Sequence, residues 1–279
     1  MAINKNHIRS ISLPSRSHPT TLQIEEQLNK IRTWEASAAP TAETISNGLC
    51  GLVELYKSMD DLLNLPQTLQ TFSKYQNAKW VDEILECPVK LLDVCGILRD
   101  LVSQFKENVR DLQSSLRRKK GDLSIESCIT KYTTFRKKMK KDAKKCISTL
   151  KKMDQAIEAS ILDVDQHISS LIKVVKEVNA LSVSIFQYVW VFFSSSNSNS
   201  SKWSISRLLV NKGRVACEVQ QVIKNELEVI DDALCNDCSK VQQKLEKLEA
   251  SIEGIENGLE GMSRCLIRSR ASFLNVISC

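Results

Sequence analysis

The chain has 279 residues, of which 42% are hydrophobic, 5% aromatic and 26% charged, with a formal net charge of +6. All five prolines lie in the first 96 residues, which favours long unbroken helices in the rest of the chain. No sustained alternation of apolar and polar residues is present, which argues against a β-sheet. The sequence contains no run of 18 apolar residues, so it predicts no membrane-spanning helix. We therefore expect an all-α fold, an elongated antiparallel bundle of long helices with a coiled-coil-like C-terminal helix.

Residues 1–19 are polar and basic, and we expect a disordered tail there. Within this tail Arg9, Ser10, Ser12 and Pro14 match the R-S-x-S-x-P pattern that 14-3-3 proteins bind once the second serine is phosphorylated. A phosphoserine dianion pairs with an arginine cluster, and the proline turns the chain out of the binding groove. A featureless tail and an organellar transit peptide, plastid targeting included, stay open as alternatives.

Residues 20–193 are expected to form the helical bundle. Apolar residues at steps of three and four predict a helix over 21–37, a second from a Thr41 cap to about residue 65, and a third over 78–116. Pro88 should kink the third helix or divide it in two, because proline lacks the N–H of a helix interior.

The stretch from residue 117 to 152 holds fourteen Lys or Arg against three acids, a net charge of +11. Apolar residues recur along it at steps of three and four, so residues 123–159 are predicted to form an amphipathic helix with a strongly cationic polar side. The candidates for binding an anionic surface are Arg136, Lys137, Lys138, Lys140, Lys141, Lys144 and Lys145.

The remainder of the chain is predicted to contain another helix over 161–193, a Ser/Asn-rich linker over 194–202 and a C-terminal helical hairpin over 203–279 that packs on the bundle. From Leu234 to Leu266 the apolar residues alternate in steps of four and three, the repeat of a coiled-coil seam. This seam could close within one chain or between two, so the oligomeric state stays open.

The C-terminal region is also acidic, with eleven acids against four lysines over 218–260, a net charge of −7. Gly254, Gly258 and Gly261 lie beside the seam and predict a close helix crossing or a bend.

The basic helix and the acidic C-terminal region could be partners inside one bundle, which would explain both without a ligand. Seven negative charges cannot neutralise eleven positive ones, however, so a cationic surplus could instead meet anionic lipid or an acidic protein. Nucleic acid is disfavoured because the sequence has no helix-turn-helix spacing, zinc finger or RNP string.

The sequence gives no sign of an enzyme. Its three histidines are scattered, and it contains no HExxH, GxSxG, P-loop or GxGxxG motif. A single CxxC at Cys235 and Cys238 lacks the second pair that a zinc site needs. We expect no catalytic residue, no metal and no cofactor.

Several strings together resemble a plant family of all-helical proteins related to BYPASS. They are HIRSISLPSRSHPTTLQIEEQLNKIRTWEAS, LYKSMDDLLNLPQT, KWVDEILE, LLDVCGILRD, DLQSSLRRKKGDLSIESCITKY, RKKMKKDAKKCISTLKKM, KWSISRLLVNKGRVACE and LEKLEASIEGIENGLEGMSRCLIRSRASFLNVIS. Their order and spacing agree along essentially the whole chain, apart from the Ser/Asn-rich linker.

The resemblance implies a helical protein without enzymatic activity that is linked to root and shoot development. BYPASS itself is associated with restraining a root-derived mobile signal that arrests shoot growth. We therefore expect a non-enzymatic intracellular regulator or adaptor that acts through helical protein–protein contacts in the cytoplasm. The alternative is a peripheral membrane or trafficking-associated protein that docks through its lysine-rich helix.

Overall fold

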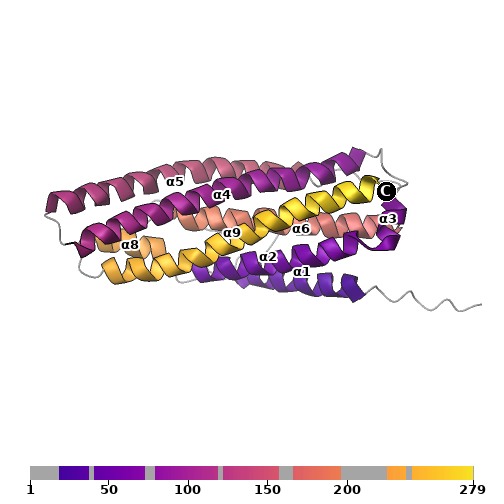
Figure 1. Cartoon of the computed structure of the whole chain (residues 1–279), viewed down its shortest axis with the longest axis horizontal. Helices are drawn as coiled ribbons and strands as arrows, with labels where there is room; N and C mark the ends of the chain where they lie inside the picture. Colours follow the sequence, from indigo (N-terminus) through magenta and orange to yellow (C-terminus); the bar gives the residue numbers. More distant parts are fainter. Residues whose placement is uncertain are drawn as a thin grey trace, which may run out of the picture.

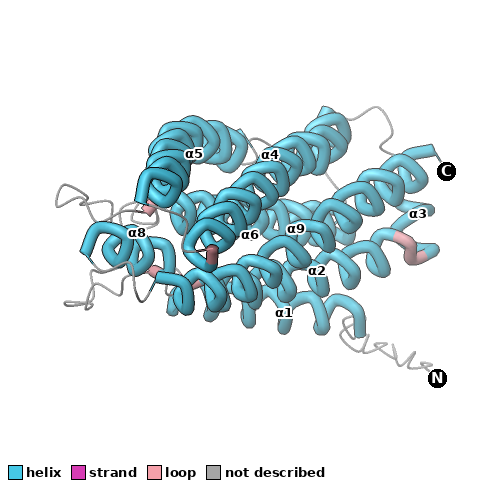
Figure 2. Tube along the Cα trace, turned by 60° about the vertical axis from the view of Figure 1, so that its left-hand side comes forward, coloured by secondary structure: helices cyan, strands magenta, loops and turns pink. Residues whose placement is uncertain are grey.

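The structure is a computed structural model, and it describes residues 19–37, 41–72, 79–118, 122–156, 166–195, 225–236 and 241–278. Every regular element in these ranges is a helix, and no strand is present among them (Figure 2). The predicted all-α fold is confirmed. The R-S-x-S-x-P string at Arg9–Pro14, most of the Ser/Asn-rich linker and Cys238 lie outside the described ranges.

Eight helices cover these ranges. They are α1 (Pro19–Ser37), α2 (Ala42–Leu63), α3 (Pro66–Phe72), α4 (Lys79–Arg117), α5 (Asp122–Ala156), α6 (Gln166–Ser194), α8 (Glu226–Asn236) and α9 (Val241–Ser278).

The long helices lie side by side in an elongated bundle (Figure 1). In this view α9 lies between α4 and α2, and α6 lies behind them. The basic helix α5 is outermost beyond α4, whereas α1 is outermost beyond α2 on the opposite side. The most extensive helix contacts are those of α9 with α2 and with α4, so the C-terminal helix is part of the core.

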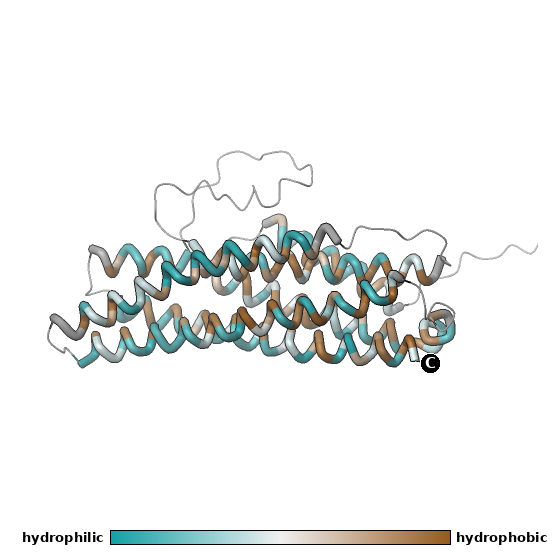
Figure 3. Tube along the Cα trace, turned by 90° about the horizontal axis from the view of Figure 1, so that it is seen from above, coloured by the Kyte–Doolittle hydropathy of each residue, from teal (hydrophilic) through white to brown (hydrophobic). Residues whose placement is uncertain are grey.

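The seam of α9 explains this central position. Its buried positions keep alternating steps of four and three from Val241 to Val276, ten residues beyond Leu266. The helices that cover the seam, α2 and α4, belong to the same chain, so in this structure the seam closes within one chain. Leu234, predicted as the start of the seam, instead belongs to α8. The long helices each carry hydrophilic and hydrophobic residues, as the amphipathic pattern requires (Figure 3).

Proline 88 does not divide α4. The helix runs through it from Lys79 to Arg117. Of the two alternatives predicted for Pro88, a kink or a division of the helix, the division is therefore wrong. Cys87 and Leu91 on either side of the proline are buried, with exposed fractions of 6% and 0%. Burial of these neighbours stabilises the helix across the position where proline removes a hydrogen bond.

The helices α2 and α9 cross at close range. A Cβ atom added at Gly258 would lie 2.7 Å from Cβ of Leu49, and one at Gly254 would lie 2.8 Å from Oγ of Ser46. The predicted close crossing at these glycines is confirmed, because only a residue without a side chain leaves room for the facing helix.

Candidate functional site: the lysine face of α5

The apolar side of α5 is covered by α4 and α6. Its buried apolar residues are Tyr132, Met139, Ala143, Ile147, Leu150 and Met153. Because these residues recur at helical spacing, the opposite side of the helix points away from the bundle. That arrangement places the lysines of α5 on the outer surface.

We call the side chains of Lys137, Lys138, Lys140, Lys141, Lys144 and Lys145 the lysine face. Five of the six are exposed, and only Lys140 is half-buried. Partial burial, reinforced by the nearby charge of Arg136, lowers the pKa of Lys140. Within the described ranges no ion pair neutralises any of the six, although ion pairs occur elsewhere on the same helix.

Four of the five acids of α9 are paired with α4 rather than with the lysine face. Four ion pairs join the two helices in antiparallel order: Arg99–Glu260, Lys106–Glu256, Arg110–Glu249 and Arg117–Glu246. From Arg99 to Arg117 they extend along about 27 Å of helix, at about 1.5 Å per residue. Helix α4 separates this acidic side of α9 from α5 (Figure 1). The interpretation that the basic helix and the acidic region neutralise each other is therefore wrong for the lysine face.

Arg136 does not belong to the anion-binding surface, in contrast to the prediction. Its exposed fraction is 2%, and its Nη2 atom lies 3.0 Å from Oδ2 of Asp231 on α8. The guanidinium also donates to the carbonyl oxygens of Phe193 and Ser195 at the end of α6. The donors of this buried guanidinium already have acceptors within the protein, so Arg136 is not available to bind an external anion.

This cluster joins three elements that are distant in sequence. Asp231 accepts a second hydrogen bond from the Tyr132 hydroxyl over 3.2 Å, and Asn225 donates to the carbonyl oxygen of Phe192 over 3.0 Å. Arg136 follows Tyr132 by four residues and precedes Met139 by three, so it lies on the buried stripe of α5. Helical spacing could have separated it from the lysines, whereas charge alone could not.

Other site classes find no support in the described part of the chain. No group of three or more His, Cys, Asp or Glu side chains there could hold a metal ion. No helix there is both long and apolar enough to cross a membrane.

Comparison with known proteins places the chain in a family. A family model described as Protein BPS1 matches residues 48–276. The chain belongs to the BPS1 family. The match begins within α2 and ends near the end of α9, so in this family member it includes the lysine face, the α4–α9 ion pairs and the Arg136 cluster. The resemblance to BYPASS-related proteins is thereby confirmed. A search of curated proteins and a search of solved structures found no match.

Proposed function

We propose that this BPS1 family member is a non-enzymatic regulator of plant root and shoot development that acts as an adaptor, with the lysine face as its main contact surface. Family membership supports the developmental role. The observation that supports the contact surface is the pairing of acids of α9 with α4, which leaves the lysine face without an ion pair in the described structure.

The partner we propose for the adaptor is a protein with an acidic surface. From Lys137 to Lys145 the face spans about 12 Å of helix. Exposed lysines near an acidic patch accelerate association and select partners by charge. Such an interaction weakens with salt because the charges on both sides are screened.

A second candidate is docking on an anionic membrane, which the position of α5 on the outside of the bundle favours (Figure 1). Each lysine near an anionic lipid surface contributes about 1 kcal/mol. The large exposed apolar side chains of the described structure are Leu22, Ile97, Ile267 and Leu274, none of which lies on α5. Contact through α5 would therefore be electrostatic, without insertion into the acyl chains.

Fractionation of the tagged protein from plant cells, at low salt and then at 0.5 M salt (a screening length of about 4 Å), distinguishes the two candidates. The adaptor function predicts a soluble complex at low salt that becomes smaller at high salt, as measured by size-exclusion chromatography. Membrane docking predicts a pellet at low salt that high salt releases. A monomeric soluble protein at both salt concentrations would contradict both.

Charge reversal identifies the surface responsible. The variant Lys137→Glu, Lys141→Glu, Lys144→Glu should lose whichever association is found. The matched control is Arg264→Glu, Arg268→Glu, Arg270→Glu, which makes the same change of charge at exposed positions of α9. If both variants lose the association equally, net charge rather than the lysine face is responsible.

A further inference from the structure

Ser148 lies on α5 one turn beyond the lysine face, and its side chain is exposed. Its hydroxyl has no hydrogen-bond partner within the described ranges. The adjacent Thr149 instead donates a hydrogen bond to the carbonyl oxygen of Lys145 over 3.2 Å. Of these two hydroxyl groups, that of Ser148 is therefore the one free to react with an external molecule.

The positions that surround Ser148 on the helix surface are all lysines. In an α-helix the surface neighbours of residue i are the residues at i−4, i−3, i+3 and i+4. For Ser148 these are Lys144, Lys145, Lys151 and Lys152, and all four are exposed. The ion pairs that α5 makes within the described ranges involve other residues. The free hydroxyl thus stands in the middle of four unpaired positive charges.

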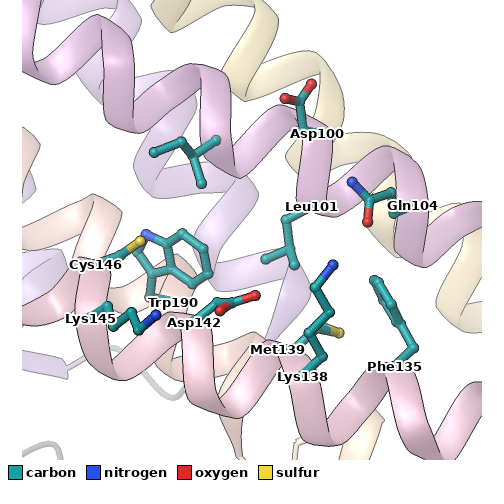
Figure 4. A pocket seen from close by; sticks show the side chains of 11 residues that line it. Asp100, Leu101, Gln104, Phe135, Lys138, Met139, Asp142, Lys145, Cys146 and Trp190 are labelled. Carbon is teal, nitrogen blue, oxygen red and sulfur yellow. The ribbon is translucent and has the colours of Figure 1, made fainter.

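Ser148 also lies on the outermost side of α5. It follows Lys137, Lys141 and Lys144 at helical steps of four, three and four, so the four side chains form one row. The one acid that α5 carries between Lys137 and Ser148 is Asp142, and Figure 4 shows it among the side chains that line the groove between α4 and α5. No acid therefore lies in the row that contains Ser148.

We propose that Ser148 is a phosphorylation site, modified by a protein kinase that selects basic residues on both sides of its target serine. Acidic residues in the substrate groove of such a kinase complement the flanking lysines. In the reaction the serine oxygen forms a bond to the γ-phosphorus of ATP, and the bond from that phosphorus to the bridging oxygen of ADP breaks. ADP leaves, and the hydroxyl proton passes to the catalytic base of the kinase.

The position of Ser148 along α5 allows a kinase to reach it. A kinase that binds an extended segment must open the helix around the serine. Ser148 lies in the last turns of α5, which ends at Ala156, and segments near the end of a helix open at a lower free energy than the whole fold. The kinase therefore needs local opening of α5 rather than unfolding of the bundle.

Phosphorylation would change the charge where the lysines are most concentrated. A phosphoserine carries about −1.5 to −2 charges at pH 7, so the four surrounding lysines would keep a net charge of about +2. Lys144 and Lys145, which belong to the lysine face, would then pair with the phosphate instead of an acidic partner. The modification thereby weakens binding by the lysine face. This consequence rests on the proposed function, whereas the modification itself does not.

Incubation of the full chain with ATP and the catalytic domain of protein kinase C, a kinase that selects basic residues on both sides of its target, tests the modification. Mass spectrometry then follows the tryptic peptide from Cys146 to Lys151. This peptide should gain one phosphate in wild type and in the matched control Thr149→Ala, but none in Ser148→Ala. A peptide that stays unmodified in wild type, or that is still phosphorylated in Ser148→Ala, would overturn the proposal.

Phosphoserine incorporated during translation at position 148 tests the consequence, with fluorescent polyglutamate as the acidic probe. Its Kd should rise by about tenfold, since the phosphate offsets about two lysine charges and one exposed charge pair contributes at most about fivefold. The matched control carries phosphoserine at position 103, because Ser103 is also exposed and its four helical neighbours on α4 are two basic and two acidic residues.

The two assays fail separately. If the unmodified chain does not bind polyglutamate, the lysine face is contradicted as a contact surface, and the regulatory consequence falls with it, while the peptide assay still decides the modification site. If the unmodified chain binds and phosphoserine at positions 148 and 103 weakens binding equally, regulation through Ser148 is overturned, although the lysine face stands.

Discussion

The Arg110 guanidinium on α4 donates a hydrogen bond from Nε to Oε1 of Glu249 on α9 over 2.6 Å. This contact is one of four ion pairs between the acidic side of α9 and basic residues of α4. The lysine face of α5 consequently has no ion pair with α9, although this acidic helix is present in the same bundle. The choice of neighbouring helices thus determines which charged side chains of the bundle are paired and which remain unpaired on its surface.

The Arg110–Glu249 pair predicts a specific pH dependence. The hydrogen bond from Arg110 is the main cause that holds the pKa of the Glu249 carboxyl below its usual value of 4.5. A depressed pKa means that the contribution of the pair to stability is present at neutral pH and is lost as the pH falls through the folded-state pKa. Glu249→Gln should therefore lower the free energy of unfolding by at most about 1 kcal/mol at pH 7, because the pair is partly exposed.

Urea denaturation of wild type and Glu249→Gln, at pH 7 and again well below pH 4.5, measures this difference. It should shrink toward zero at the lower pH. A difference that persisted unchanged in acid would show that Glu249 stabilises the fold by something other than its charge.

Arg136 and Lys137 are neighbours in sequence with opposite roles, and their alanine variants should differ accordingly. Arg136→Ala leaves Asp231 and two carbonyl groups at the end of α6 without their donor. Loss of a buried partner of this kind lowers the free energy of unfolding by about 3 kcal/mol. Lys137→Ala removes an exposed side chain and should change it by less than about 0.5 kcal/mol. Chemical denaturation compares them, and equal effects would contradict the structural role of Arg136.

The glycines offer a second matched pair. Gly258→Ala places a Cβ 2.7 Å from Cβ of Leu49, so the α2–α9 crossing must widen and the free energy of unfolding should fall by about 1–3 kcal/mol. Gly96→Ala has nothing within 4 Å and lies inside α4, so it should stabilise the protein by about 0.5–1 kcal/mol. Thermal denaturation shows whether each variant is more or less stable than wild type. A stabilising Gly258→Ala would mean that α2 and α9 cross less closely than described.

The N-terminal tail gives a prediction that does not depend on the bundle. A peptide that contains Arg9, Ser10 and Pro14, with Ser12 phosphorylated, should bind 14-3-3 protein in a calorimetric titration, because the phosphate pairs with arginines of the binding groove. The unphosphorylated peptide is the control and should not bind. Absence of binding by the phosphopeptide rules the motif out.

Much of the fold follows from periodicity in the sequence. The spacing of apolar residues predicts α5 to within three residues at either end, because burial requires one apolar side on each helix. It also predicts the part of the α9 seam from Val241 to Leu266, but not its continuation to Val276. The function of Arg136 was missed because its charge matches the neighbouring lysines, whereas its helical position matches Tyr132 and Met139. The sequence leaves a kink or a division of α4 at Pro88 open, and the continuous helix excludes the division because packing overrides a local preference.

The candidate site was only partly predictable for a related reason. Sequence identifies the lysines but not their neighbours, and two arrangements of the same helices would give opposite electrostatic surfaces. If α9 lay beside α5, its glutamates would neutralise the lysine face. Instead Lys106 and Arg117 of α4 pair with Glu256 and Glu246.

Rescue of a plant that lacks this protein tests whether the lysine face is the functional surface. Wild type and the variant Arg264→Glu, Arg268→Glu, Arg270→Glu should restore root and shoot growth, whereas Lys137→Glu, Lys141→Glu, Lys144→Glu should not. Denaturation curves of the purified variants must first show that all three proteins fold equally well. Full rescue by the lysine variant at equal protein abundance would contradict the account.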